Sequence, residues 1–158
     1  MVQLRNISAS QFEMRLREEE ALDGKHGRES VAWFAIEQGD LGNGEVDELT
    51  VSTSGTSIGF LQNYGSNPIF LASIQSTFES DPVGLEPSNY SSTGITIGLR
   101  EEQSADTETS HLDENLGYLA MSNVGDLTLA SGEVYGEVGH ENVSSDWKTV
   151  NLLSLIHI

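Results

Sequence analysis

Short runs in which apolar and polar residues alternate recur along this chain, and residues typical of turns separate them. Phe12, Met14 and Leu16, for example, alternate with charged residues, which is the period of two expected of a strand with one buried face. The longest series predicts strands at about residues 45–52, 57–62, 68–78, 83–87, 94–102 and 115–122. No convincing helix interrupts this series. The pattern therefore predicts an all-β fold, in the form of an antiparallel six-stranded β-sandwich.

One stretch of this pattern occurs twice. The segment Leu16–Glu20 precedes His26, Glu29 and an apolar run at residues 31–36, and the same order returns as Leu99–Gln103, His111, Glu114 and the run 116–121. The offset is 83 residues at the first motif and 85 at the histidine, so the intervening loop has gained two residues. Loops between folded elements tolerate such insertions, and the arrangement predicts a tandem repeat with a period of roughly 85–90 residues.

The repeat divides the chain into three copies. Residues 1–38 are the C-terminal part of a truncated first module, and residues 44–122 are a complete module. Residues 132–152 are the N-terminal part of a truncated third module, in which Gly132-Glu133-Val134 aligns with Gly44-Glu45-Val46. Residues 153–158 resemble the translated read-through of a sequencing adapter, as in a metagenomic gene fragment, and receive no functional weight. Truncated copies expose strand edges, so residues 2–37 are expected either to pair with residues 132–152 as an improvised module or to aggregate.

Four segments need a structural interpretation of their own. Residues 31–36 are apolar at both odd and even positions, which predicts a central strand covered on both faces. A helix competes for residues 10–22, but the counterpart at residues 94–99 carries β-branched residues and two glycines, which disfavour a helix. Asn6-Ile7-Ser8 and Asn89-Tyr90-Ser91 have the form of glycosylation sites, yet they share one repeat position and are better explained as turns.

Charge narrows the classes of binding partner. The chain has 25 acidic and 7 basic residues, for a net charge of −18. Such a field repels nucleic acid and anionic membrane surfaces and attracts divalent cations, so no nucleic-acid partner is expected. No run of 18 apolar residues occurs, which argues against membrane insertion. The chain has no cysteine, so neither disulfides nor thiol chemistry contributes.

Several short motifs follow an order known from one family. In the complete module they are Tyr64-x-x-Asn67-Pro68, Asn89-Tyr90-Ser91 before Gly94-Ile95, and Tyr118-Leu119-Ala120; the first copy has Asn6-Ile7-Ser8 before Gln11-Phe12, and Trp33-Phe34-Ala35. This order resembles that of H-type lectin domains, and more narrowly the H-type lectin-like repeats of large secreted bacterial proteins. The chain departs from the family pattern where Ile95 replaces a phenylalanine and Gln11 replaces a glycine.

The resemblance covers the chain as far as residue 152. It implies a lectin-like, carbohydrate-binding or adhesion repeat module of a large exported protein, located extracellularly or at the cell surface. The partners implied are a glycan or cell-surface polysaccharide and the neighbouring repeat modules.

The repeated motif supplies the best candidate site. Its residues are Arg17, Glu18, His26 and Glu29 in the first copy and Arg100, Glu101, His111 and Glu114 in the second. Glu18 and Glu101 continue the inward rows of their strands, and a carboxylate that leaves the core needs an arginine, a histidine or a cation beside it. Three interpretations stay open: a structural ion-pair cluster, a metal site and a ligand-binding rim. A mixed His and Glu set would suit a transition metal better than calcium.

A second acidic group crowds the linker after the first copy, and it comprises Asp40, Asn43, Glu45, Asp47 and Glu48. Ca²⁺ between modules would stiffen a spacer repeat that has no ligand of its own, although a solvated acidic linker also explains these residues and no EF-hand pattern is present. The chain has no nucleophile elbow, H-E-x-x-H, phosphate loop or cysteine nucleophile, so we do not expect an enzyme. The sequence thus supports a carbohydrate-binding repeat and, as the alternative, a structural spacer repeat.

Overall fold

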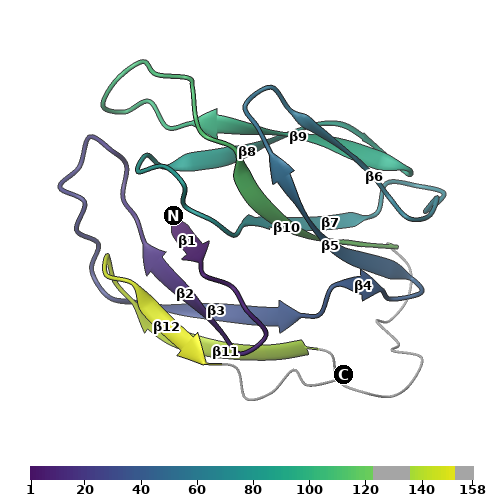
Figure 1. Ribbon diagram of the computed structural model, residues 1–158, viewed down its shortest axis with the longest axis horizontal. Coiled ribbons are helices and arrows are strands. Elements are labelled where there is room, and N and C mark those ends of the chain that lie inside the picture. Colours follow the sequence, from purple (N-terminus) through teal and green to yellow (C-terminus); the bar gives the residue numbers. More distant parts are fainter. Residues whose placement is uncertain (123–135, 152–158) are drawn as a thin grey trace.

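The chain is built of β-strands joined by turns and loops (Figure 1). The computed structural model describes residues 1–122 and 136–151, with residues 136–141 described by their backbone alone. Its strands are β1 (Val2–Arg5), β2 (Gln11–Leu16), β3 (Glu29–Ile36), β4 (Gly39–Asp40), β5 (Gly44–Val51), β6 (Thr56–Gly59), β7 (Ile69–Ile74), β8 (Val83–Ser91), β9 (Gly94–Glu101), β10 (Glu114–Met121), β11 (Gly136–Val143) and β12 (Lys148–Asn151). All pairings between them are antiparallel, which confirms the predicted all-β, antiparallel class. In these residues no helix is long and apolar enough to cross a membrane.

The central unit comprises residues 39–121 and consists of two sheets. One sheet has the order β4-β5-β10-β7, and the other has the order β6-β9-β8. Apolar side chains of both sheets share one core, in which Val51, Ile97 and Leu116 are at most 1% exposed. Alternate residues of each strand point into this core, so each sheet buries one face. This alternation is the period of two seen in the sequence.

Three strands of the central unit differ from the prediction by two residues or more in length. The strand expected at residues 57–62 ends at Gly59. The strand expected at residues 68–78 ends at Ile74, because Ser76 and the Phe78 amide turn away from the sheet to bond the Glu114 carboxylate. The strand expected at residues 83–87 continues to Ser91 through Pro87. A proline is tolerated there because β8 lies at the edge of its sheet.

The end unit comprises residues 2–36 and 136–151, and it combines strands from the two ends of the described chain (Figure 1). It has a sheet of order β1-β2-β12 and the pair β11-β3. A separate core holds it together, formed by Phe12, Met14, Leu16, Val143 and Val150. The sequence predicts that the flanking segments either pair with each other or aggregate. In the structure they pair, through β12 with β2 and β11 with β3.

The strand pairings of the end unit repeat those of the central unit in the same register. Gly44 of β5 lies opposite Met121 of β10, and Gly136 of β11 lies opposite Ile36 of β3, which is 85 residues before Met121. The pairing of β12 with β2 likewise reproduces that of β6 with β9, and the pairing of β1 with β2 reproduces that of β8 with β9. Within the end unit, β11 and β12 therefore take the places of β5 and β6.

This register corrects the alignment of the third copy. The tripeptide that the sequence analysis aligned with Gly44-Glu45-Val46 begins at Gly132 and lies outside the described residues. The place of Gly44–Val51 is taken by Gly136–Val143, which also begins with Gly-Glu-Val. Two such tripeptides stand four residues apart, and only the pairing with β3 distinguishes them.

The prediction that residues 31–36 form a strand covered on both faces was wrong. Among the described residues β3 pairs with β11 alone, and no strand takes the place beside it that β7 has beside β10. Its side chains alternate in exposure, with Phe34 55% exposed and Val31 and Trp33 packed against the core. An apolar run is thus compatible with a half-covered strand when few neighbouring strands are present.

Asn6 and Asn89 adopt the left-handed backbone conformation, with φ of 51° and 49°. Asparagine is one of the few non-glycine residues that tolerate this region, because its short side chain bonds nearby groups. Asn6 precedes β2 and Asn89 lies at the end of β8, at the same position of the two units. The backbone therefore gives both asparagines a turn role.

Candidate functional site

Glu101, His111 and Glu114 lie together at one end of the central unit. Glu101 is the last residue of β9, Glu114 is the first residue of β10, and His111 lies in the connection between the two strands. All three side chains are buried, whereas Arg100 is exposed. The inward row of β9, formed by Ile95, Ile97 and Leu99, continues directly into Glu101 because alternate residues of a strand share a face.

His111 fastens two backbone segments. Its Nδ1 lies 2.8 Å from the carbonyl oxygen of Leu112, and its Nε2 lies 3.2 Å from the carbonyl oxygen of Asp81. Carbonyl oxygens only accept hydrogen bonds, so this geometry calls for two N–H donors and hence a protonated imidazolium. Burial lowers the pKa of His111, but the two carbonyls and then the carboxylates of Glu101 and Glu114 outweigh it and raise the pKa. The geometry thus gives His111 no free nitrogen for a metal.

Glu114 is a structural carboxylate. It accepts hydrogen bonds from the Ser76 hydroxyl and, at 2.9 Å, from the Phe78 amide, and it is 1% exposed. These bonds hold the segment after β7 against the start of β10. A buried carboxylate that is satisfied in this way stabilises a loop and has little capacity left for an outside ligand.

Glu101 has a different environment. It is 7% exposed, and neither of its carboxylate oxygens has a hydrogen-bond donor. The nearest cationic atom is His111 Nε2, at 3.9 Å, and that nitrogen faces the Asp81 carbonyl. Burial raises the pKa of Glu101, the charge of His111 lowers it, and the nearby carboxylates, with Asp81 first, raise it again.

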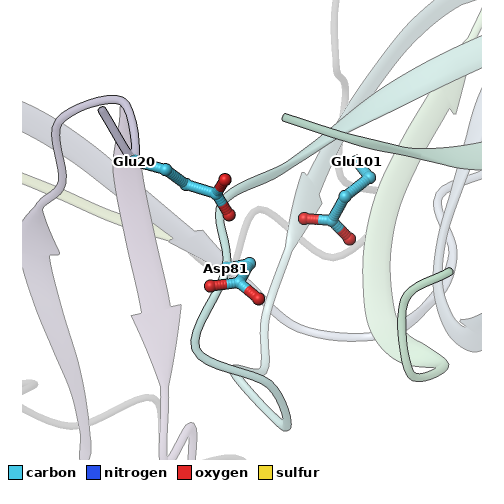
Figure 2. A group of neighbouring side chains, drawn as sticks. All are labelled: Glu20, Asp81 and Glu101. Carbon is cyan, nitrogen blue, oxygen red and sulfur yellow. The ribbon is translucent and has the colours of Figure 1, made fainter. Parts of the chain in front are cut away.

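Two further carboxylates approach Glu101. Figure 2 shows Glu20, from the loop after β2, and Asp81, from the segment before β8, with their carboxylates turned toward that of Glu101. One carboxylate oxygen from each of the three lies within 4.8 Å of the others. The pKa of Glu20 is raised, first by burial and then by the charges of Asp81 and Asp106. The motif analysis missed Glu20 and Asp81, because one lies in a loop and the other lies outside the repeated motif.

The corresponding residues of the first copy do not form such a group. His26 Nε2 lies 3.8 Å from Glu29, but the Glu29 side chain is 63% exposed. Because β2 ends at Leu16, Glu18 lies beyond the strand, is only half-buried and makes no side-chain hydrogen bond within the described chain. Arg17 contributes its backbone, which bonds that of Met1. Equivalent sequence positions therefore have different surroundings in the two units.

The acidic residues of the linker after the first copy have different environments in the structure. Glu45 is 1% exposed and accepts hydrogen bonds from the Leu61 amide at 2.6 Å and the Tyr118 hydroxyl at 2.9 Å, with the Tyr64 hydroxyl at 3.4 Å. It lies on the inward row of β5 with Leu49 and Val51, which alternation alone could have revealed. Glu45 is thus a core anchor, while Glu48 is exposed.

A hollow of about 200 Å³ lies between the two units. It is lined by Met1, Val2 and Gln3 on one side and by residues of β7, β8 and the segment between them on the other, including Asp81. Pockets for small organic ligands are usually larger, on the order of 300–1,000 Å³. The hollow has room for water or a small ion at the junction of the units.

Comparison with known proteins relates the chain to a much longer protein. No protein-family model matches the chain, and no solved structure matches it. The chain is similar to halomucin. It is 31% identical over 126 residues to this protein of Haloquadratum walsbyi, a match that covers 74% of the present chain and 1% of halomucin. The chain thus spans about one hundredth of the length of halomucin.

Proposed function

We propose that this chain is a run of tandem β-sandwich modules from a very long protein displayed outside the cell, and that the modules act as folded spacers. One observation carries the proposal: the end unit repeats the strand pairings of the central unit in the same register. One recurring unit with its own core is how a long protein can be extended without a single large fold.

Three further observations support a spacer. The similarity to halomucin concerns a stretch that fills 1% of that protein, as a module in a long array would. The buried carboxylates Glu45 and Glu114 bind groups of the unit itself. The net charge of −18 keeps neighbouring modules and neighbouring molecules apart. An extracellular or cell-surface location follows from this proposal.

Force spectroscopy on the intact chain tests the spacer function. A spacer should resist tension, so the central unit is expected to unfold in one step that releases about 28 nm of chain, on the order of 3.4 Å for each residue from 39 to 121. Gradual extension without a discrete step of this length would contradict the proposal.

Carbohydrate binding is the second candidate, and one surface feature favours it. Phe78 and Leu112 are 60% and 56% exposed, and each is followed in the sequence by an acidic residue, Glu79 and Asp113. The bonds from the Leu112 amide to Glu79 and from the Phe78 amide to Glu114 hold the two loops together. An exposed aromatic ring next to carboxylates offers a stacking face and hydrogen-bond acceptors for sugar hydroxyls. The order of motifs shared with H-type lectins supports the same candidate.

A glycan array probed with the labelled chain separates the two functions. If the second candidate holds, the chain binds one class of glycan, Phe78→Ala loses that binding, and Phe34→Ala, which removes an equally exposed ring from the end unit, retains it. If wild type binds no glycan, the modules are spacers alone. Binding that survives Phe78→Ala would place any sugar site elsewhere.

A further inference from the structure

Three carboxylates from separate segments meet where the end unit touches the central unit. Glu20 belongs to the loop that follows β2, whereas Asp81 precedes β8 and Glu101 ends β9 (Figure 2). One oxygen from each lies within 4.8 Å of the other two. Like charges at this spacing repel one another strongly when water is partly excluded.

The surroundings of Glu101 distinguish this group from an ordinary cluster of surface acids. Its side chain is buried, it points into the group, and both of its carboxylate oxygens lack a hydrogen-bond donor. Buried carboxylates in proteins almost always have such donors or a metal ion, because an unsatisfied buried charge is destabilising.

His111 does not fill this role. Its two nitrogens face the carbonyl oxygens of Leu112 and Asp81, and the 3.9 Å between Nε2 and Glu101 is too long for a hydrogen bond. The imidazolium adds one positive charge beside three carboxylates. Negative charge therefore remains in excess at this point of the junction.

We propose that Glu20, Asp81 and Glu101 bind a divalent cation, Ca²⁺, at the junction of the two units. An all-oxygen ligand set selects a hard cation over the transition metals that a histidine ligand would favour. Ca²⁺ accepts carboxylate oxygens in a flexible geometry, whereas Mg²⁺ demands a near-ideal octahedron and usually keeps several of its waters. Three carboxylates from three separate segments, with one oxygen of each within 4.8 Å of the others, therefore suit Ca²⁺ better than Mg²⁺. Water would complete the coordination shell.

The ion would tie the loop after β2 to the central unit. The two are already joined by the Glu20 amide, which donates to Glu102 at 2.8 Å, and by the Ala21 amide, which donates to Ser104 at 3.1 Å. A cation held by Glu20 on one side and by Asp81 and Glu101 on the other would fix the angle between the units. This consequence for extension rests on the spacer function proposed above, but the binding of the ion does not.

Titration of the metal-free chain tests the site, with Tb³⁺ luminescence as the probe and Ca²⁺ as the competitor. Wild type should show one saturable site that Ca²⁺ displaces. Glu101→Gln and Glu20→Gln should each weaken it by at least about tenfold, the loss of one charged ligand. Glu86→Gln removes the same charge from an exposed position of β8 and should bind like wild type. Equal binding by wild type and Glu101→Gln, or no saturable site in wild type, would overturn the proposal.

Melting with EDTA or Ca²⁺ provides a second readout. Because the free carboxylate of Glu101 is unsatisfied, Glu101→Gln should melt at or above wild type in EDTA and lose the stabilisation by Ca²⁺. If Glu101 only forms an ion pair with His111, the opposite is expected. Wild type is then insensitive to EDTA, and Glu101→Gln is less stable than wild type in every buffer. Hydrogen exchange at the Glu20 and Ala21 amides should slow with Ca²⁺ in wild type and stay unchanged in Glu101→Gln.

Discussion

At the scale of single residues, the central unit depends on two buried carboxylates in addition to apolar packing. Glu45 and Glu114 each replace their water shell with hydrogen bonds from loops that would otherwise be loosely attached. Such groups stabilise a fold only when every oxygen is satisfied, and removing them leaves donors buried without acceptors. Their mutational effects should therefore exceed those of surface acids in the same strands.

Glu45→Ala is the sharpest test of this role. The change leaves the Tyr118 hydroxyl and the Leu61 amide without their acceptor and is expected to lower the free energy of unfolding by about 3 kcal/mol. Urea denaturation measures the loss. Glu48→Ala removes an exposed acid from the same strand and should change stability by less than about 0.5 kcal/mol. Equal effects of the two substitutions would contradict the anchoring role of Glu45.

The buried hydroxyl of Tyr118 should make the stability of the protein depend on pH in the alkaline range. Burial, followed by its hydrogen bond to Glu45, raises the pKa of Tyr118 far above its ordinary value. An acid whose pKa is raised by folding stabilises the protein fully below the unfolded pKa, here about 10, and this stabilisation is lost as the pH rises further. Unfolding free energy should thus fall steeply above about pH 10.

Tyr118→Phe removes this titrating group. The variant should be less stable than wild type near neutral pH, by about 1 kcal/mol for the lost hydrogen bond, but its stability should fall less steeply above about pH 10. Urea denaturation at several pH values measures both slopes. The pKa of Tyr64 is also raised by burial, so part of the slope should persist. Parallel pH profiles of the two proteins would argue against the role of Tyr118.

At the scale of elements, close approach between strands limits which side chains fit. A Cβ added at Gly94 would lie 2.5 Å from the carbonyl oxygen of Ile58 in β6, whereas at Gly98 the nearest atom, the carbonyl oxygen of Glu86, is 3.8 Å away. Both glycines belong to β9, so they form a matched pair. Backbone atoms cannot yield as a flexible side chain can.

Gly94→Ala should therefore push β6 away from β9 and destabilise the chain by about 2 kcal/mol, within the usual range for overpacking. Gly98→Ala should leave stability unchanged or raise it by up to about 1 kcal/mol, because alanine loses less backbone entropy on folding. Chemical denaturation of both variants measures the difference. A harmless Gly94→Ala would mean that β6 and β9 are farther apart in solution.

The pairing of β12 with β2 is the second element-scale test. Val150 is 3% exposed in the core of the end unit, and Val150→Asp would bury a charge there. Hydrogen exchange should then accelerate in β2 while the core of the central unit stays protected. Asn151→Asp introduces the same charge at an exposed neighbour and should change neither. Unchanged exchange in β2 after Val150→Asp would mean that the end unit does not rely on β12.

At the scale of the whole molecule, the net charge of −18 is a source of self-repulsion in the folded state. Salt shortens the range of this repulsion, from a Debye length of about 10 Å at 0.1 M to about 3 Å at 1 M. Raising NaCl across this range should raise the melting temperature by about 5 °C or more, since this range of salt removes most long-range repulsion.

Neutralising exposed acids should reproduce part of the salt effect. The combined variant Glu19→Gln, Glu48→Gln, Glu86→Gln and Glu108→Gln changes only exposed side chains outside the proposed cation site. It should melt above wild type at low salt and respond less to NaCl, as measured by circular dichroism. The same salt response in both proteins would show that general solvent effects, and not charge repulsion, set the salt dependence.

The sequence by itself determined the approximate positions of six strands of the central unit, but not of β4, and its antiparallel all-β class. Period-two alternation reports which face of a strand is buried, and this preference is local. It placed Ile95, Ile97 and Leu99 in the core, and it carried enough information to place Glu45 there as well. The doubled motif located Glu101, His111 and Glu114. These residues lie close together because β9 ends and β10 begins at the same end of the unit, with His111 in the loop between the two strands.

Only the tertiary structure decided which strands pair and which loops meet. The choice between two Gly-Glu-Val tripeptides depended on the register of β11 with β3, which are about a hundred residues apart in the chain, and no local pattern encodes it. The half-exposed state of β3 likewise depended on which strands were present beside it. Glu20 reached Glu101 because the end unit packs on the central unit, and Asp81 reached it because β8 pairs with β9 at Val83 and Glu101. Contacts between distant segments arise from the packing of whole units, and alternation within one strand carries no record of them.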